Sequence, residues 1–123
     1  MQELNILILD DEERLLDELT EYLEGSGFRI FKAHKPTKGM KIVLNEKIDI
    51  AIIDIRLPEY NGIEFLKKIK LVKPDIEAIM MSGHGDVDNV IEAMRSGAFD
   101  YLKKPFAPLD IKVAIERTSK YVH

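Results

Sequence analysis

Short apolar runs alternate with stretches of helical spacing along the whole chain. Residues 4–9 (LNILIL) and 48–53 (IDIAII) are almost unbroken apolar runs, too short for stable helices and rich in β-branched residues. Such runs are typical of strands that are buried on both faces of a parallel sheet. Residues 28–33 alternate between apolar and polar positions, which predicts a strand nearer the edge. Residues 76–81 and 99–102 complete the five predicted strands.

Helical spacing fills the segments between and after these runs. Apolar residues recur at intervals of three and four positions, which predicts helices over residues 15–23, 63–70, 87–94 and 111–115. Gly25 and Gly27 end the first of these helices, and Pro74 and Gly97 end the next two.

The segment 37–45 gives the weakest helix prediction. Met40 and Val43 have helical spacing, but Pro36 and Gly39 disturb the pattern. With this helix included, five strands alternate with five helices in a (βα)5 chain. Right-handed crossovers then place helices on both faces of an open parallel sheet. In such sheets, ligands bind beyond the carboxyl ends of the strands.

Composition narrows the class of protein. A length of 123 residues fits a single domain, residues 1–123, with one core. Cysteine is absent, which excludes disulfides, thiolate metal sites and cysteine nucleophiles. A net charge of −4 argues against nucleic-acid binding by the domain itself. No segment approaches the ~20 apolar residues that span a bilayer, and Asp10 and Asp11 interrupt the first run, so we expect a cytoplasmic domain without membrane contact.

Polar residues follow the predicted strands. Asp10 and Asp11 follow the first strand, Asp54 the third, Ser82 the fourth and Lys104 the fifth. All of them lie at the same edge of the sheet if the predicted topology holds. Two like charges ~4 Å apart repel by roughly 4 kcal/mol at an effective dielectric constant of 20. Three carboxylates at this edge therefore need a cation or raised pKa values.

The residue types indicate which cation. Oxygen ligands without histidine or cysteine favour a hard ion, Mg²⁺ first and Mn²⁺ as the alternative. The charges of a divalent metal and of Lys104 would then cancel those of the three aspartates. A near-neutral site with a carboxylate is suited to accept a phosphoryl group.

Each of these residues also has a purely structural explanation. Asp10 and Asp11 could occupy a helix N-terminus, where acidic residues are favourable, and Asp54 could be a turn aspartate. Ser82 and Lys104 carry little information when each is taken alone. The prediction of a site depends on the appearance of all these residues at strand ends, in order.

Together these motifs resemble the receiver domain of two-component response regulators over essentially the whole chain. The matching segments are Asp10-Asp11, Asp54-Ile55-Arg56-Leu57-Pro58 through Gly62, Ser82, and Tyr101 to Lys104-Pro105-Phe106. The spacings from Ser82 and from Tyr101 to Lys104 match as well. Residues 82–86 and 97–101 resemble the receivers of nitrogen-regulatory, enhancer-binding activators in particular.

The resemblance implies a fold and a metal site. The fold is a flavodoxin-like three-layer sandwich with a five-stranded parallel sheet in the order 2-1-3-4-5. Asp54 would be the phosphoacceptor, and Asp11 and Asp54 would bind the metal directly. Asp10 would hold a metal-bound water, and the backbone carbonyl of Arg56 would be a further ligand.

It also implies a switch. Ser82 and Lys104 would stabilise the phosphoryl group, Tyr101 would rotate in response, and the Lys104-Pro105 bond would be cis. The surface of the fourth helix, fifth strand and fifth helix would then change. The implied partners are a sensor histidine kinase as phosphoryl donor, a C-terminal effector domain or downstream protein that regulates transcription, and a phosphorylation-dependent second copy. The domain would catalyse its own phosphorylation and slow dephosphorylation.

Three alternatives stand beside this interpretation. An FMN-binding electron carrier shares the fold, but its phosphate loop would not be Asp-Asp-Glu. An aspartate-nucleophile phosphohydrolase would carry its nucleophile after the first strand. A pseudo-receiver that only binds partners would not need the complete acidic set. His84 could contact a phosphoryl group, although an exposed loop histidine is the simpler explanation.

Overall fold

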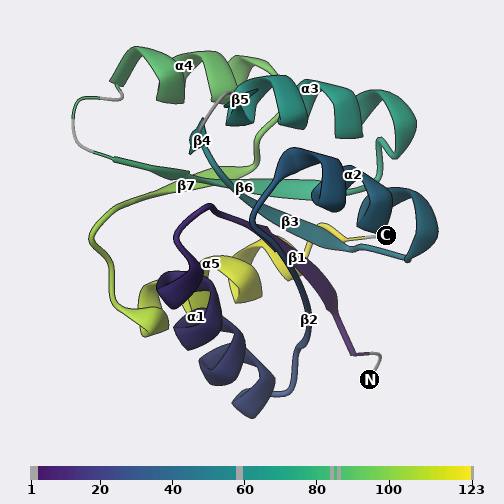
Figure 1. Cartoon of the computed structure of the whole chain (residues 1–123), viewed down its shortest axis with the longest axis vertical. Helices are drawn as coiled ribbons and strands as arrows, with labels where there is room; N and C mark the ends of the chain where they lie inside the picture. The colour runs from purple at the N-terminus through teal and green to yellow at the C-terminus, as the bar shows by residue number, and fades with distance from the viewer. Residues whose placement is uncertain (1–2, 58–59, 84, 86, 123) are drawn as a thin grey trace.

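Five parallel strands form the centre of the structure, a computed structural model that describes residues 3–57, 60–83, 85 and 87–122 (Figure 1). The strands are β1 (Asn5–Leu9), β2 (Arg29–Ala33), β3 (Ile50–Asp54), β6 (Glu77–Ser82) and β7 (Asp100–Lys103). They pair in the order β2-β1-β3-β6-β7. The predicted topology, with the residue 28–33 segment at an edge, is confirmed.

In the part of the chain that the structure describes, five helices cover the two faces of this sheet (Figure 1). They are α1 (Glu13–Gly25), α2 (Pro36–Asn45), α3 (Gly62–Val72), α4 (Val87–Arg95) and α5 (Pro108–Ser119). Helices α1 and α5 lie on one face, and α2, α3 and α4 lie on the other. None of the helices in the described part of the chain is long and apolar enough to cross a membrane.

Alternate residues of the central strands feed two separate cores. Ile6 and Ile8 of β1 pack with α1 and α5, whereas Leu7 and Leu9 pack with α2 and α3. All four side chains are fully buried, as the unbroken apolar run predicts for a strand covered on both faces. The rigid sheet therefore fixes the position of every residue that follows it.

Helix α2 corrects one expectation. Pro36 and Gly39 do not disturb this helix. Pro36 occupies its first turn, where the missing N–H costs nothing. Gly39 is buried, and a Cβ there would lie 3.1 Å from the ring of Phe65, so glycine lets α2 pack closely against α3.

Strand ends differ from the predicted ones by one or two residues. The third strand covers 50–54 instead of 48–53, and the fourth ends at Ser82, so Asp54 and Ser82 are the last residues of their strands. A two-stranded hairpin of β4 (Arg56–Leu57) and β5 (Tyr60–Asn61) was not predicted. This hairpin carries the chain from Asp54 back to α3.

Gly62 allows the close return of this loop. Its N–H donates to the carbonyl of Ile55 at 2.7 Å, and a Cβ at Gly62 would overlap the carbonyl oxygen of Asp54. Asn61 begins α3 by accepting the N–H of Ile63 at 2.7 Å. The segment thereby packs α3 directly against the end of β3.

Gly62→Ala should lower the free energy of unfolding by about 2–3 kcal/mol, because backbone atoms must move to admit the methyl group. Gly25→Ala is the matched control, since nothing lies within 4 Å of a Cβ at that helix end. We expect the control to be neutral or stabilising by up to about 1 kcal/mol. Urea denaturation of both variants measures the difference, and equal effects would show that the close approach is unimportant.

Candidate functional site

Three carboxylates meet at the carboxyl ends of β1 and β3. Asp10 follows β1 and is fully buried, Asp54 ends β3 with 5% of its surface exposed, and Asp11 is exposed. One oxygen from each lies within 4.8 Å of the others. The Asp10 N–H continues the pairing of β1 with β2 by donating to Ala33 at 3.1 Å. The sheet thus holds these residues together, as the sequence predicted.

Lys104 bridges two of these carboxylates. Its Nζ lies 2.7 Å from Oδ2 of Asp10 and 2.9 Å from Oδ2 of Asp54. The backbone N–H of Lys104 donates to the carbonyl of Ser82 at 2.7 Å, which fixes the backbone from which the lysine side chain extends. Burial alone would lower the pKa of Lys104, but its bonds to the two aspartates outweigh burial and raise that pKa. The lysine therefore stays charged at neutral pH.

Backbone N–H groups donate to the other carboxylate oxygen of Asp10 and of Asp54. Oδ1 of Asp10 accepts the N–H of Glu12 at 2.9 Å, and Oδ1 of Asp54 accepts the N–H of Arg56 at 3.0 Å. Sequence reasoning missed these two donors. Aspartate commonly accepts the N–H two residues further on, so its position at a strand end was the available signal.

The charge state of Asp54 is balanced between opposing effects. Burial raises the pKa of Asp54, the hydrogen bond from Lys104 lowers it, and the charge of Asp10 raises it again, to about 6. At pH 7 the carboxylate is therefore mostly ionised but remains sensitive to any added charge. A nearby cation would favour the ionised form.

The donor set fits a hard divalent cation. In the described part of the chain, Asp10, Asp11 and Asp54 form the only group of three acidic or histidine side chains close enough to hold a metal. All of their donors are carboxylate oxygens, the type that Mg²⁺ prefers. The carboxylate of Asp11 has no hydrogen-bond or ion-pair partner among the described residues, so it is free to act as a ligand. Arg56 lies beside this group at the start of β4.

Ser82 and Tyr101 lie to one side of the carboxylates. Ser82 ends β6 almost fully buried, and in the sheet it faces Lys103 of β7. Tyr101 is 46% exposed and, with Ser82, lines a cavity of about 710 Å³. The Lys104-Pro105 peptide bond is cis. His84 lies outside the described residues.

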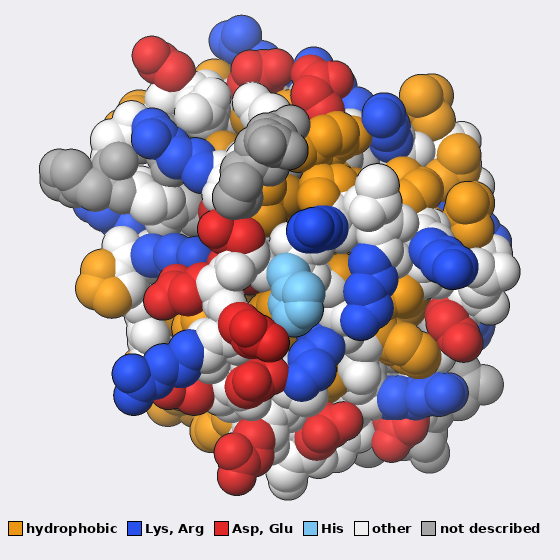
Figure 2. Space-filling model, viewed as in Figure 1, with side chains coloured by type: hydrophobic (Ala, Val, Ile, Leu, Met, Phe, Trp, Pro, Cys, Tyr) orange, Lys and Arg blue, Asp and Glu red, His pale blue; other side chains and the backbone are white. Residues whose placement is uncertain are grey.

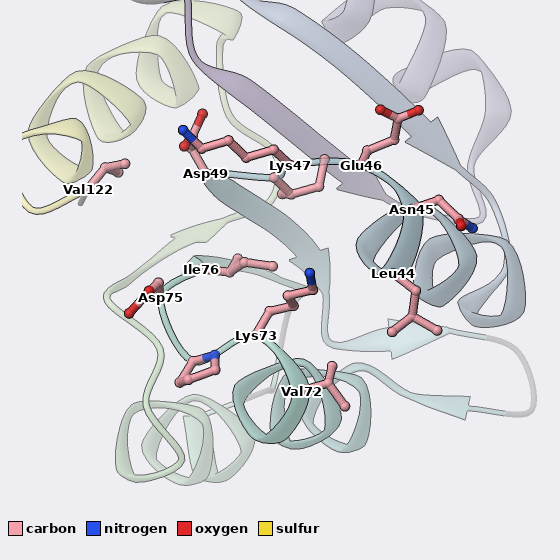
Figure 3. A pocket seen from close by; sticks show the side chains of 12 residues that line it. Leu44, Asn45, Glu46, Lys47, Asp49, Val72, Lys73, Asp75, Ile76 and Val122 are labelled. Atoms are coloured by element: carbon pink, nitrogen blue, oxygen red, sulfur yellow. The ribbon is translucent and has the colours of Figure 1, made fainter.

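A smaller cavity at the opposite end of the sheet has a different character. It has a volume of about 430 Å³ and lies between the loops that follow α2 and α3 (Figure 3). Acidic and basic side chains are mixed around it: Glu46, Lys47, Asp49, Lys73 and Asp75. The Asp49 carboxylate already accepts the N–H of Asn5 at 2.9 Å. The described lining of this cavity has no group of three acidic side chains close enough to hold a metal ion.

Surface charge is divided between neighbouring helices. On the face shown in Figure 2, acidic side chains gather over α1 and basic side chains over α2. Lys32 of β2 pairs with Asp17 of α1 at 2.7 Å. Lys35, Lys38 and Lys41 have no ion-pair partner in the described part of the chain, as expected for a solvated face.

Comparison with known proteins identifies the family. Residues 6–116 match the response regulator receiver domain. Two-component response regulator PprB of Pseudomonas aeruginosa is 36% identical over 97% of this chain and 45% of its own length. Transcriptional regulatory protein FixJ of Rhizobium meliloti is 33% identical over 99% of this chain and 60% of its own length. The chain thus spans about half the length of these relatives.

Solved structures agree over nearly the full length of both chains. A receiver domain protein from Clostridium thermocellum superimposes with a TM-score of 0.89 at 36% identity, covering 95% of this chain and 94% of that one. A CheY-like receiver domain protein from Methanospirillum hungatei gives a TM-score of 0.92 at 30% identity, covering 98% and 97%. The chain therefore belongs to the receiver domain family of two-component response regulators.

Proposed function

We propose that Asp54 accepts a phosphoryl group from a sensor histidine kinase in a Mg²⁺-dependent reaction. The observation that carries this proposal is the Lys104 ammonium, held 2.9 Å from Asp54 and 2.7 Å from Asp10, with the open carboxylate of Asp11 beside them. This arrangement offers a nucleophile, a fixed cation and an unused metal ligand at one strand edge. Family membership makes an FMN carrier or a phosphohydrolase the poorer interpretation.

Asp11 and Asp54 would hold the metal directly, with Asp10 binding through water and the Arg56 carbonyl as a further ligand. When bound, Mg²⁺, or Mn²⁺ in its place, supplies positive charge for the phosphoryl oxygens. An oxygen of Asp54 attacks phosphorus in line, an O–P bond forms, and the N–P bond to the kinase histidine breaks. The Lys104 ammonium moves from the carboxylate to a phosphoryl oxygen. The domain later catalyses the slow hydrolysis of the phosphoryl group from Asp54.

The conformational response to phosphorylation of Asp54 takes place at the cavity beside Ser82. The Ser82 hydroxyl donates to the phosphoryl group and moves toward it, which opens space for the ring of Tyr101. Tyr101 then turns inward from its exposed position and changes the surface formed by α4, β7 and α5. The two conformations need differ by only a few kcal/mol for phosphorylation to shift their populations.

We treat residues 1–123 as one receiver domain and infer that a distinct effector carries the output. This chain covers 60% of the length of FixJ, which is named as a transcriptional regulatory protein, and 45% of the length of PprB. We infer that a linked or separate effector reads the switched surface to regulate transcription. A phosphorylation-dependent second copy is the other partner that we infer.

Acetyl phosphate with Mg²⁺ should add one phosphoryl group to the protein, and Asp54→Asn should abolish this gain. Asp75→Asn is the matched control, because Asp75 is exposed at the opposite end of the sheet. Intact-mass spectrometry measures the gain. Equal labelling of the wild-type protein and Asp54→Asn would refute the assignment.

Asp11→Asn should weaken Mg²⁺ binding roughly tenfold or more, because it removes one of the charged oxygen ligands. The shift of the melting temperature with Mg²⁺ concentration reports this affinity without phosphorylation. Glu13→Gln removes a neighbouring exposed carboxylate and should leave the affinity unchanged. If both variants bind Mg²⁺ like the wild type, Asp11 is not a ligand.

Asp54→Asn should stabilise the metal-free protein at pH 8 by about 3 kcal/mol. The pKa of Asp54 is about 6 in the folded protein, against roughly 3.9 in the unfolded chain. The folded state therefore binds more protons between these values, and the free energy of unfolding falls as the pH rises through this range. Asparagine resembles the protonated acid, so the gain should vanish near pH 4.

Denaturation in EDTA at pH 4, 6 and 8 measures this dependence, with Asp75→Asn as control. A constant difference between the wild type and Asp54→Asn across the range would show that the carboxyl group is not shifted.

A further inference from the structure

Helix α4 leaves much of its apolar side exposed, although Val90 and Ala93 pack against the core. Val87, Val90, Ile91 and Met94 follow helical spacing and form one stripe, here called the α4 stripe. Three of these residues remain exposed: Val87 by 70%, Ile91 by 47% and Met94 by 41%. Within α4, only Ala93 is fully buried. A stripe of this kind normally faces a core, so its exposure calls for an occupant.

The α4 stripe lines a groove instead of a flat surface. All four of its residues border the cavity of about 710 Å³, and Tyr101 of β7 forms the opposite wall. Ser82 and Gly83 lie at the end nearest the carboxylates. This volume falls within the range of roughly 300–1,000 Å³ that is usual for sites binding small molecules, and an apolar lining is usual there as well.

Among the described residues that line this groove, two are cationic. Arg95 ends α4, and Lys103 lies two residues after Tyr101, on the same side of β7. Both side chains are exposed, and neither has an ion-pair partner among the described residues. The nearby carboxylates of Glu92 and Asp100 pair instead with Lys67 at 3.2 Å and Arg117 at 3.1 Å. The described lining of the groove contains no acidic residue.

We propose that this groove binds a small amphipathic anion, such as a medium-chain carboxylate. Its apolar body would lie on the α4 stripe and against the ring of Tyr101. Its anionic group would pair with Arg95 and Lys103. As an occupant of the groove itself, a second copy related by a two-fold axis fits less well, because an isologous contact would bring the cationic groups of two grooves together.

Such a ligand would also control the switch, an inference that rests on the proposed function. The ligand fills the space beside Ser82 that the ring of Tyr101 enters after phosphorylation. The two events therefore compete. By linkage, phosphorylation must weaken ligand binding by the same factor as the ligand weakens binding of a phosphoryl mimic.

Isothermal titration of the whole chain with decanoate, below its micelle concentration, tests the site itself. We expect saturable binding, weaker by about tenfold in Arg95→Gln/Lys103→Gln because two ion pairs are lost. Ile91→Ser should weaken binding by roughly fivefold through lost apolar contact. Decylammonium, with the same tail and the opposite charge, should bind much more weakly.

Matched variants separate this site from general adsorption. Lys38→Gln/Lys41→Gln removes two unpaired cations from α2, and Leu71→Ser removes an apolar side chain that is 83% exposed. Neither should change the affinity for decanoate. Equal binding of decanoate and decylammonium, or equal losses in all variants, would overturn the proposal. So would self-association that Ile91→Ser abolishes without any decanoate binding, since the occupant would then be a second copy.

The coupling is tested with beryllofluoride and Mg²⁺ as the phosphoryl mimic. We expect about tenfold weaker decanoate binding in its presence, and an equal loss of beryllofluoride affinity at saturating decanoate. Beryllofluoride binding that leaves decanoate affinity unchanged would refute the control of the switch. Failure of beryllofluoride to bind would count against the proposed function alone, because the decanoate titration does not depend on Asp54.

Discussion

The repulsion between Asp10 and Asp54 is the constraint on which the rest of the site depends. The sheet forces these buried carboxylates together, because each is fixed at the end of a strand in the middle of the fold. Lys104 relieves the repulsion by bonding to both. A buried carboxylate pair that lost this ammonium would be costly, because one unpaired charge would remain buried beside another.

This same cluster explains why the acceptor can be reactive. A protonated carboxyl group is a poor nucleophile, so the acceptor must be ionised to attack phosphorus. Burial and the charge of Asp10 hold the pKa of Asp54 near 6, while Lys104 keeps it from rising further. The ionised form therefore predominates at neutral pH, and the exposed Asp11 carboxylate is available to bind a metal cation beside it.

Apolar patterning was sufficient to predict the topology and the edge where the site lies. A run as short and apolar as residues 4–9 favours a strand covered on both faces, and the ends of such strands then define the site. Two features could not be read in this way. The α2 prediction failed to recognise that Gly39 packs against Phe65, a contact between distant segments. The β4–β5 hairpin has too few residues for any periodicity to appear.

Exposed and partly buried side chains alternate along β7, and this strand connects the carboxylate cluster with the groove beside α4. Tyr101 and Lys103 are exposed on the side of α4, whereas Leu102 between them packs into the core beneath α1 and α5. Lys104 follows directly and reaches the carboxylates. A displacement of Lys104 toward a phosphoryl group therefore acts on a strand whose other side borders the groove. Because the core holds Leu102, the edge residues and the exposed α4 are the parts of this region with freedom to respond.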